Sequence, residues 1–205
     1  MSAPRAAAGR HNAIDVSNGT VAVKNVAAIA LSVSLLASGP AEAGAAAYAK
    51  LIDLDGKSAG RVRLMSISHG VLIEIEVHGL APGAHAIAVH ATGRCDPAGQ
   101  FASAGPIFSF DPARAHGFLA KGGPRAGDLP NQVAGADGIL HASMITTAFT
   151  LGNGVRSILD RDGSAIIVYA KADDYTTQPD GRAGARVICG TIVRTGEAGT
   201  RRAHR

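Results

Sequence analysis

The stretch 71–78 is the feature that most narrows the folds open to this chain. Its sequence, VLIEIEVH, places β-branched apolar residues at every second position. Glu74, Glu76 and His78 occupy positions of the opposite face. Because successive side chains of a strand point to opposite sides, this pattern indicates a strand with one buried and one exposed face. The chain therefore needs a sheet packed on a hydrophobic core.

The rest of the chain supports an all-β fold with many turns. The 26 glycines and 9 prolines occur in turn-sized clusters, and the 205 residues are 46% hydrophobic, which suits one domain with a real core. Long polar loops are predicted over 91–130 and 171–184. The pattern predicts an eight-stranded Greek-key β-barrel or sandwich. The expected strands are 46–54, 60–68, 71–78, 83–90, 132–134, 139–145, 164–170 and 185–193.

The N-terminal region reads as a secretion signal over 1–43. An uncharged apolar run over 26–38 follows Lys24 and precedes an Ala-Glu-Ala cleavage motif, which makes Gly44 the expected mature start. The alternative is a membrane anchor, although the run is short for a span. Residues 1–20 are long and polar for a signal, which favours a true start near Val21 or Val23. We expect a periplasmic or secreted protein with no membrane span after cleavage.

The expected mature protein is a domain over 44–193 followed by a disordered basic tail over 194–205. Net charge is +4, and the positive charges before the tail are scattered. Because no basic stripe with interleaved aromatic residues is present in the sequence, nucleic-acid binding is not expected.

Two cysteines, Cys95 and Cys189, lie 94 positions apart and form no short metal-binding spacing. In an oxidising compartment they would form a disulfide that ties the first long loop to the last strand. The chain-entropy model gives such a bridge about 4–5 kcal/mol. The alternative is two reduced, buried thiols.

Several motifs together resemble the periplasmic copper–zinc superoxide dismutases over about residues 46–193. The resemblance implies their β-barrel fold. In that family copper is held by four histidines and zinc by three histidines and an aspartate, with one histidine shared. The motifs are Gly79-Leu80-x-Pro82-Gly83-x-His85, Ser103-Ala104-Gly105-Pro106-x-Phe108, His116-Gly117, Ala126-Gly127-Asp128-Leu129-Pro130-Asn131, Asp160-Arg161-Asp162-Gly163-Ser164-Ala165, Ala172-Asp173-Asp174-Tyr175 and Gly184-Ala185-Arg186-x-x-Cys189-Gly190.

Carried over by motif, the metal ligands are only partly present. The retained ligands are His90 for copper and His116 and Asp128 for zinc. The lost positions are Ala88 and Tyr169 for copper, Arg125 for zinc and Ile107 for the shared histidine. A copper ion that cycles between two oxidation states needs nitrogen ligands that suit both. Ala88 and Ile107 supply no ligand atom, so ordinary copper catalysis is not expected.

Further family positions remain. Arg186 matches the arginine that guides superoxide, and a small anion could bind near it; the alternative is a salt bridge to Asp173 or Asp174. Asp173 matches the aspartate that links the two metal sites, and it could pair with His90, His116 or Tyr169. We expect an Arg125–Asp128 ion pair to replace zinc in pinning the long loop, the alternative being that Arg125 points to solvent.

The leading hypothesis is an exported superoxide dismutase-like protein that is not catalytic and has a binding or structural role. No cofactor is expected, and copper and zinc follow from the family resemblance alone. The alternative is an enzyme that converts superoxide to oxygen and hydrogen peroxide at an altered metal site, formed by His90, His116, Asp128 and Tyr169. A third hypothesis is a homodimer that binds a bulky cofactor in its groove through a surface histidine.

Overall fold

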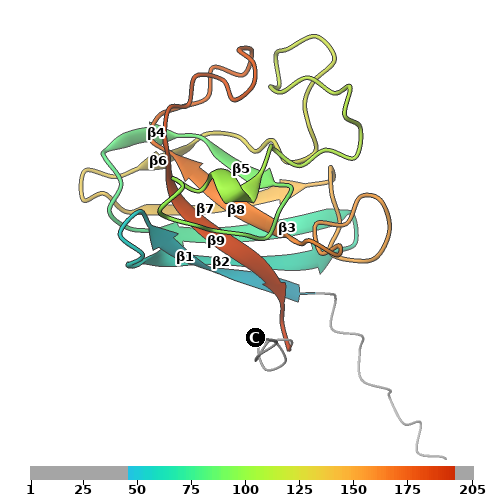
Figure 1. The fold of residues 1–205 in the computed structure, drawn as a ribbon, viewed down its shortest axis with the longest axis horizontal. Coiled ribbons are helices and arrows are strands. Elements are labelled where there is room, and N and C mark those ends of the chain that lie inside the picture. The colour runs from blue at the N-terminus through green and yellow to red at the C-terminus, as the bar shows by residue number, and fades with distance from the viewer. Residues whose placement is uncertain (1–45, 197–205) are drawn as a thin grey trace, which may run out of the picture. The chain divides into compact units, whose positions relative to one another are not determined.

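The computed structural model describes residues 46–196, which form an all-β domain (Figure 1). In this part of the chain no helix is long and apolar enough to cross a membrane. The expected signal 1–43 and residues 197–205 of the expected tail lie outside the described residues. The elements are β1 (Ala46–Asp53), β2 (Ser58–Ile67), β3 (Gly70–Val77), β4 (Gly83–His85), β5 (Ile87–His90), the 3₁₀ helix η1 (Ala102–Ala104), β6 (Gln132–Ala134), β7 (Leu140–Thr146), β8 (Ser164–Tyr169) and β9 (Arg186–Arg194).

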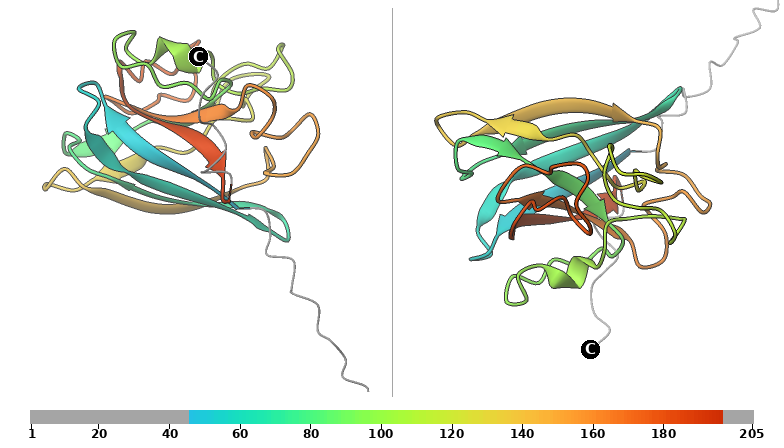
Figure 2. Two further views of the ribbon diagram at one scale, coloured as in Figure 1. Left: turned by 60° about the horizontal axis from the view of Figure 1, so that its bottom comes forward. Right: turned by 90° about the horizontal axis from the view of Figure 1, so that it is seen from above.

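Seven strands form one curled antiparallel sheet in the order β5-β8-β9-β1-β2-β3-β7 (Figure 2). The alternation that predicted β3 is confirmed, because every second residue of the strand is buried. The partly exposed Glu74 and Glu76 of β3 instead form ion pairs with Arg63 and Arg61 of β2. The fold class predicted from the sequence is thus confirmed.

The strand expected over 83–90 is two strands in the structure. At Ala86 the chain leaves β4, which pairs with β6, and enters β5, which pairs with β8. Ala86 itself donates its N–H to Lys171 O at 2.8 Å and accepts from Tyr169 N at 2.9 Å. Local alternation could not show this change of partner, because both halves keep an extended backbone. The last strand, β9, also extends one residue beyond the expected domain, to Arg194.

The buried apolar residues form two separate clusters. The larger fills the inside of the curled sheet and includes Val62, Ile73 and Leu140. The smaller lies against β5, β8 and β9 and includes Phe101 and Ala104, which belong to the first long loop. This second cluster holds the first long loop against the outer side of the sheet.

The two long loops, 91–131 and 170–185, lie on the same side of the sheet (Figure 1). The predicted disulfide between Cys95 and Cys189 is present and ties the first loop to β9. The loops are also bound to each other, because the side chain of Gln178 donates to His116 O at 2.7 Å and accepts from His116 N at 2.9 Å. The loops are therefore fixed both to the sheet and to one another.

Candidate functional site

The first long loop returns to β5 and brings the expected metal positions together. Val89 N donates to Gly127 O at 2.9 Å, and Phe108 N donates to Val89 O at 2.8 Å. Single β-bridges join Ala88 to Asp128 and His90 to Ile107. Four of the seven positions carried over from the resemblance therefore lie on adjacent stretches of backbone.

His90 is fully buried, and both of its ring nitrogens are used within the protein. Nδ1 donates to Gly105 O at 2.8 Å. With the proton on Nδ1, Nε2 accepts the hydrogen bond from the Tyr169 hydroxyl at 2.9 Å. Burial, and then the positive charge of Arg186, lower the pKa of His90 to about 3. The imidazole is therefore neutral, and the lone pair that could bind a metal is occupied by the phenol.

Neither Tyr169 nor the residues around it are suited to binding a metal ion. Burial raises its pKa to about 12, so the phenol keeps its proton at neutral pH. Tyr169, Ala88 and Ile107 all belong to the smaller apolar cluster, with exposed fractions of 2%, 4% and 5%. Three of the four lost ligand positions have thus become part of a hydrophobic core.

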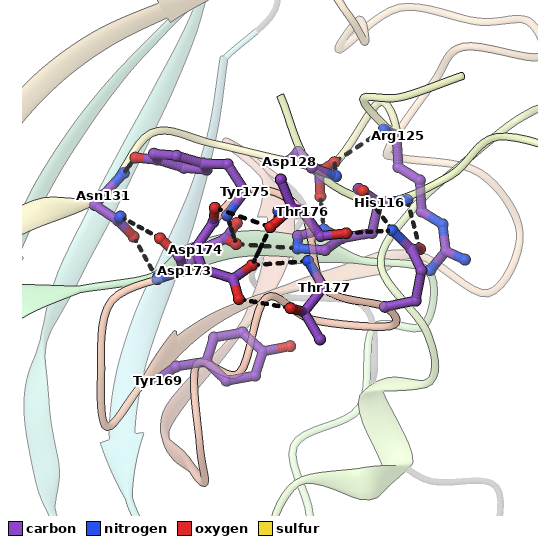
Figure 3. A network of polar contacts seen from close by, with 12 residues as sticks. His116, Arg125, Asp128, Asn131, Tyr169, Asp173, Asp174, Tyr175, Thr176 and Thr177 are labelled. Atoms are coloured by element: carbon purple, nitrogen blue, oxygen red, sulfur yellow. Dashed lines mark hydrogen bonds and ion pairs between the residues drawn. The ribbon is translucent and has the colours of Figure 1, made fainter. Parts of the chain in front are cut away.

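His116 lies between two carboxylates in a different kind of environment (Figure 3). Its Nδ1 lies 2.7 Å from Asp128 Oδ1, and its Nε2 lies 3.2 Å from Asp173 Oδ1. Burial lowers the pKa of His116, but the hydrogen bonds and charges of Asp128 and Asp173 outweigh that effect and raise it. An imidazolium can donate to both carboxylates at once. His116 therefore acts as a buried cation that joins the two long loops.

The predicted ion pair between the guanidinium of Arg125 and the carboxylate of Asp128 is wrong. Asp128 Oδ2 accepts from the backbone N–H groups of Arg125, at 2.9 Å, and Gly117, at 2.8 Å. The guanidinium of Arg125 points away from Asp128 (Figure 3). Its Nε donates to Arg114 O at 3.1 Å. The cation that pairs with Asp128 is instead His116, whose Nδ1 contacts the other carboxylate oxygen, Oδ1.

Three loop residues have roles that the sequence did not reveal. Asn131 exchanges two hydrogen bonds of 2.9 Å with the backbone of Asp173. The hydroxyl of Tyr175 accepts a hydrogen bond from Asn131 N at 2.7 Å. The side-chain amide of Gln178 bonds to the backbone N–H and carbonyl of His116. Asn131 lies in a motif used for the resemblance, but its partner is 42 residues away. No local pattern marks Gln178.

Arg186 forms neither of the salt bridges considered from the sequence. Its two terminal nitrogens donate to Phe101 O and Gly105 O, each at 2.9 Å. It lines a cavity of about 330 Å³ together with His90, Tyr169 and Arg125. His85 behaves as a framework residue, because its ring nitrogens contact only the carbonyls of Ala81 and Tyr169.

The side chains present do not fit the family's copper and zinc sites. In residues 46–196 no group of three or more histidine, cysteine, aspartate or glutamate side chains is placed to hold a metal ion. His90 and Tyr169 bond to each other, and the ring of His116 separates Asp128 from Asp173. The ligand atoms that remain are thus directed at one another.

Comparisons of this chain with known proteins all point to one family. The family model described as copper/zinc superoxide dismutase (SODC) matches residues 58–192. A superoxide dismutase [Cu-Zn] of Caulobacter vibrioides is 45% identical over 140 residues, which cover 67% of this chain and 80% of that protein. The superoxide dismutase-like protein YojM of Bacillus subtilis is 36% identical over 154 residues, which cover 73% and 77%.

Solved structures give the same fold. A crystal structure of a SOD-like protein from Bacillus subtilis matches with a TM-score of 0.67 and 37% identity, covering 71% of this chain and 97% of that one. The Cu/Zn superoxide dismutase of Brucella abortus matches with a TM-score of 0.57 and 25% identity, covering 72% and 99%.

Proposed function

This chain belongs to the copper/zinc superoxide dismutase family, and we propose that it is an exported, non-catalytic member with a binding role. We assign this role to the cavity beside Arg186. In this cavity the positive charge of the arginine is retained, whereas most of the copper ligands are replaced.

The observation that carries the proposal is the hydrogen bond from Tyr169 to His90. It places a proton donor on the one imidazole nitrogen that the copper positions still offer. Ala88 and Ile107 add only carbon atoms, and they are packed in an apolar cluster. Binding copper here would require breaking a buried hydrogen bond and placing a charge in an apolar cluster, both of which cost free energy.

The residues at and around the zinc positions also support the proposal. A structural zinc normally has four protein ligands. Here the loops are joined without any metal, by His116 between Asp128 and Asp173 and by the amide side chains of Asn131 and Gln178. These contacts support the proposal that the two loops are held together without zinc.

A relative from Bacillus subtilis supports the existence of members of this kind. It is the superoxide dismutase-like protein YojM, and solved structures of a SOD-like protein from Bacillus subtilis include a double variant with a tyrosine and a proline replaced by histidine. That variant matches this chain with a TM-score of 0.66 and 39% identity. We infer that this fold is kept both with and without histidine at those two positions.

Export is supported by the disulfide between Cys95 and Cys189, since such bonds persist in oxidising compartments. It is also consistent with the signal expected over 1–43. Cell fractionation followed by N-terminal sequencing tests this part. We expect mature protein that starts at Gly44 in the periplasm or medium, and an uncleaved cytoplasmic protein would contradict it.

The decisive experiment measures metal and activity together. The protein from residue 44 onward is dialysed against copper and zinc, and bound metal is determined by elemental analysis beside a superoxide dismutase assay. We expect less than stoichiometric copper and no dismutase activity above that of the free copper ions in the buffer. Stoichiometric copper with activity would overturn the proposal and favour the altered-site enzyme.

A reconstructed site provides the positive control. The combined variant Ala88→His, Ile107→His, Arg125→His and Tyr169→His restores all seven ligand types. We expect it to bind copper and zinc, because the backbone around these positions is retained by the β-bridges to β5. Variants with only the three copper-side changes separate the two halves of the site.

A further inference from the structure

We propose that the cavity beside His90 is a receptor for a small organic carboxylate, which binds to the guanidinium groups of Arg125 and Arg186. This inference rests on the proposed binding role and gives it a ligand class. Arg125 stands where the family has a zinc ligand, so the paired arginines are a feature of this chain.

The cavity has a volume of about 330 Å³, which suits a small metabolite. Its lining includes His90 and Tyr169, which are hydrogen-bonded to each other. Both are neutral, because the lone pair of one is satisfied by the hydroxyl proton of the other. The charge of the wall is therefore decided by Arg125, Arg186 and Asp180.

The lining of the cavity includes two arginines and one aspartate, so its formal charge is one positive charge in excess. In the described part of the chain no ion pair links Asp180 to either arginine, so its carboxylate does not neutralise them directly. A ligand with a single negative charge would balance the wall. A guanidinium binds a carboxylate through two parallel hydrogen bonds.

Both arginines are held in place and still have donors to offer. Arg186 is fixed by Phe101 O and Gly105 O, which use two of its five N–H groups. Arg125 is fixed through Nε by Arg114 O, which leaves its two terminal nitrogens unused by that bond. Side chains held before binding lose less entropy when the ligand arrives, which favours affinity.

The rest of the wall favours an organic carboxylate over an inorganic oxyanion. Ala102, Pro106, Ile107 and Pro179 present carbon atoms to the cavity. These atoms can pack on a short carbon skeleton, which phosphate does not have. Asp180 supplies an acceptor for a hydroxyl group on the ligand. A small hydroxycarboxylate meets all three requirements.

The test titrates the ¹⁵N-labelled protein from residue 44 onward with lactate, propionate and inorganic phosphate, and follows amide chemical shifts. We expect shifts at Ala102 and Gly105, with lactate bound more tightly than propionate and phosphate weakest. Arg125→Gln and Arg186→Gln should each raise the Kd for lactate about tenfold or more. The control Arg161→Gln removes one exposed charge away from the cavity wall and should leave the Kd unchanged.

Several results would overturn the inference. These are no saturable shift with lactate or propionate, equal Kd values in the arginine variants, or saturable binding of phosphate alone. If Arg186→Gln loosens the loop that it anchors, Arg125→Gln still decides the matter, because its side chain makes a single bond to Arg114 O. Metal content and dismutase activity of the unaltered protein test the proposed lack of catalysis separately from ligand binding.

Discussion

The copper half and the zinc half of the family site have lost their ligands in opposite physical ways. In the copper half, Ala88, Ile107 and Tyr169 are apolar packing residues, and His90 is a neutral hydrogen-bond acceptor. In the zinc half, Asp128 remains a buried anion, and a protonated histidine supplies the positive charge. The difference teaches that the side chains of a degenerate ligand set can be accommodated either by removing charge or by supplying a cation from another side chain.

The reason for the difference lies in what each half must hold together. The copper positions lie on β5 and β8, which are already fixed by the ladder of the sheet. The zinc positions lie on the first long loop, which has no strand partner over most of its length. A loop of this kind needs a substitute link, and the ionic cluster at His116 provides one.

The largest expected effect comes from breaking the substitute link. Asp128→Asn leaves the His116 cation buried with one carboxylate partner fewer, and the exposed fractions of the two side chains are only 3% and 0%. We expect the free energy of unfolding to fall by about 3–5 kcal/mol, measured by urea denaturation. Asp137→Asn, in an exposed turn, is the control and should change it by under about 0.5 kcal/mol. Equal effects of the two substitutions would mean that the cluster does not hold the loops.

The pH dependence of stability should have opposite signs in the two halves. The pKa of His90 is about 3 when folded, against about 6.5 when unfolded, so its contribution is present above pH 6.5 and is lost as pH falls. By linkage the loss between pH 7 and pH 5 is about 2 kcal/mol. His116 has a raised pKa, so its contribution is present below pH 6.5 and is lost as pH rises through its folded pKa.

Single histidine variants separate these two contributions. Urea denaturation of His116→Gln between pH 5 and pH 8 should show stability that rises with pH, while His90→Gln should show stability that falls with pH. The same slope in both variants would contradict the assignment of a neutral and a charged histidine.

A smaller effect is expected from removing the hydroxyl that occupies His90. Tyr169→Phe leaves Nε2 of His90 buried without a partner, which should cost about 1–2 kcal/mol in thermal or urea unfolding. The matched control is Tyr48→Phe, because the hydroxyl of Tyr48 has no hydrogen bond to the described residues. A stability loss no greater than that of the control would show that the hydrogen bond to His90 contributes little.

The smallest effect is expected at Arg125. Its guanidinium bonds to Arg114 O and does not pair with Asp128, so Arg125→Ala should lower the free energy of unfolding by under about 1 kcal/mol. Protease resistance of the first long loop should be unchanged. A loss comparable with that of Asp128→Asn would restore the ion pair that the sequence predicted and would weaken the role of His116.

Much of this site was predictable because its chain positions are marked by local motifs. The losses at Ala88, Ile107 and Tyr169 follow from the sequence once the resemblance is recognised, and so does the pairing of Cys95 with Cys189. The partner of Asp128 was not predictable. Arg125 is three residues away and His116 is twelve away, and only the path of the loop decides which side chain reaches the carboxylate.

The sequence by itself determined most of the strands, the turns between them and the loss of three of the four copper ligands, because alternation and ligand chemistry are local properties of residues. The tertiary structure alone decided that His90 bonds to Tyr169, 79 residues away, and that His116 bonds to Asp173, 57 residues away. Such pairs depend on how two loops meet over the sheet. Burial then fixes the charge of each histidine, which makes one neutral and the other a cation.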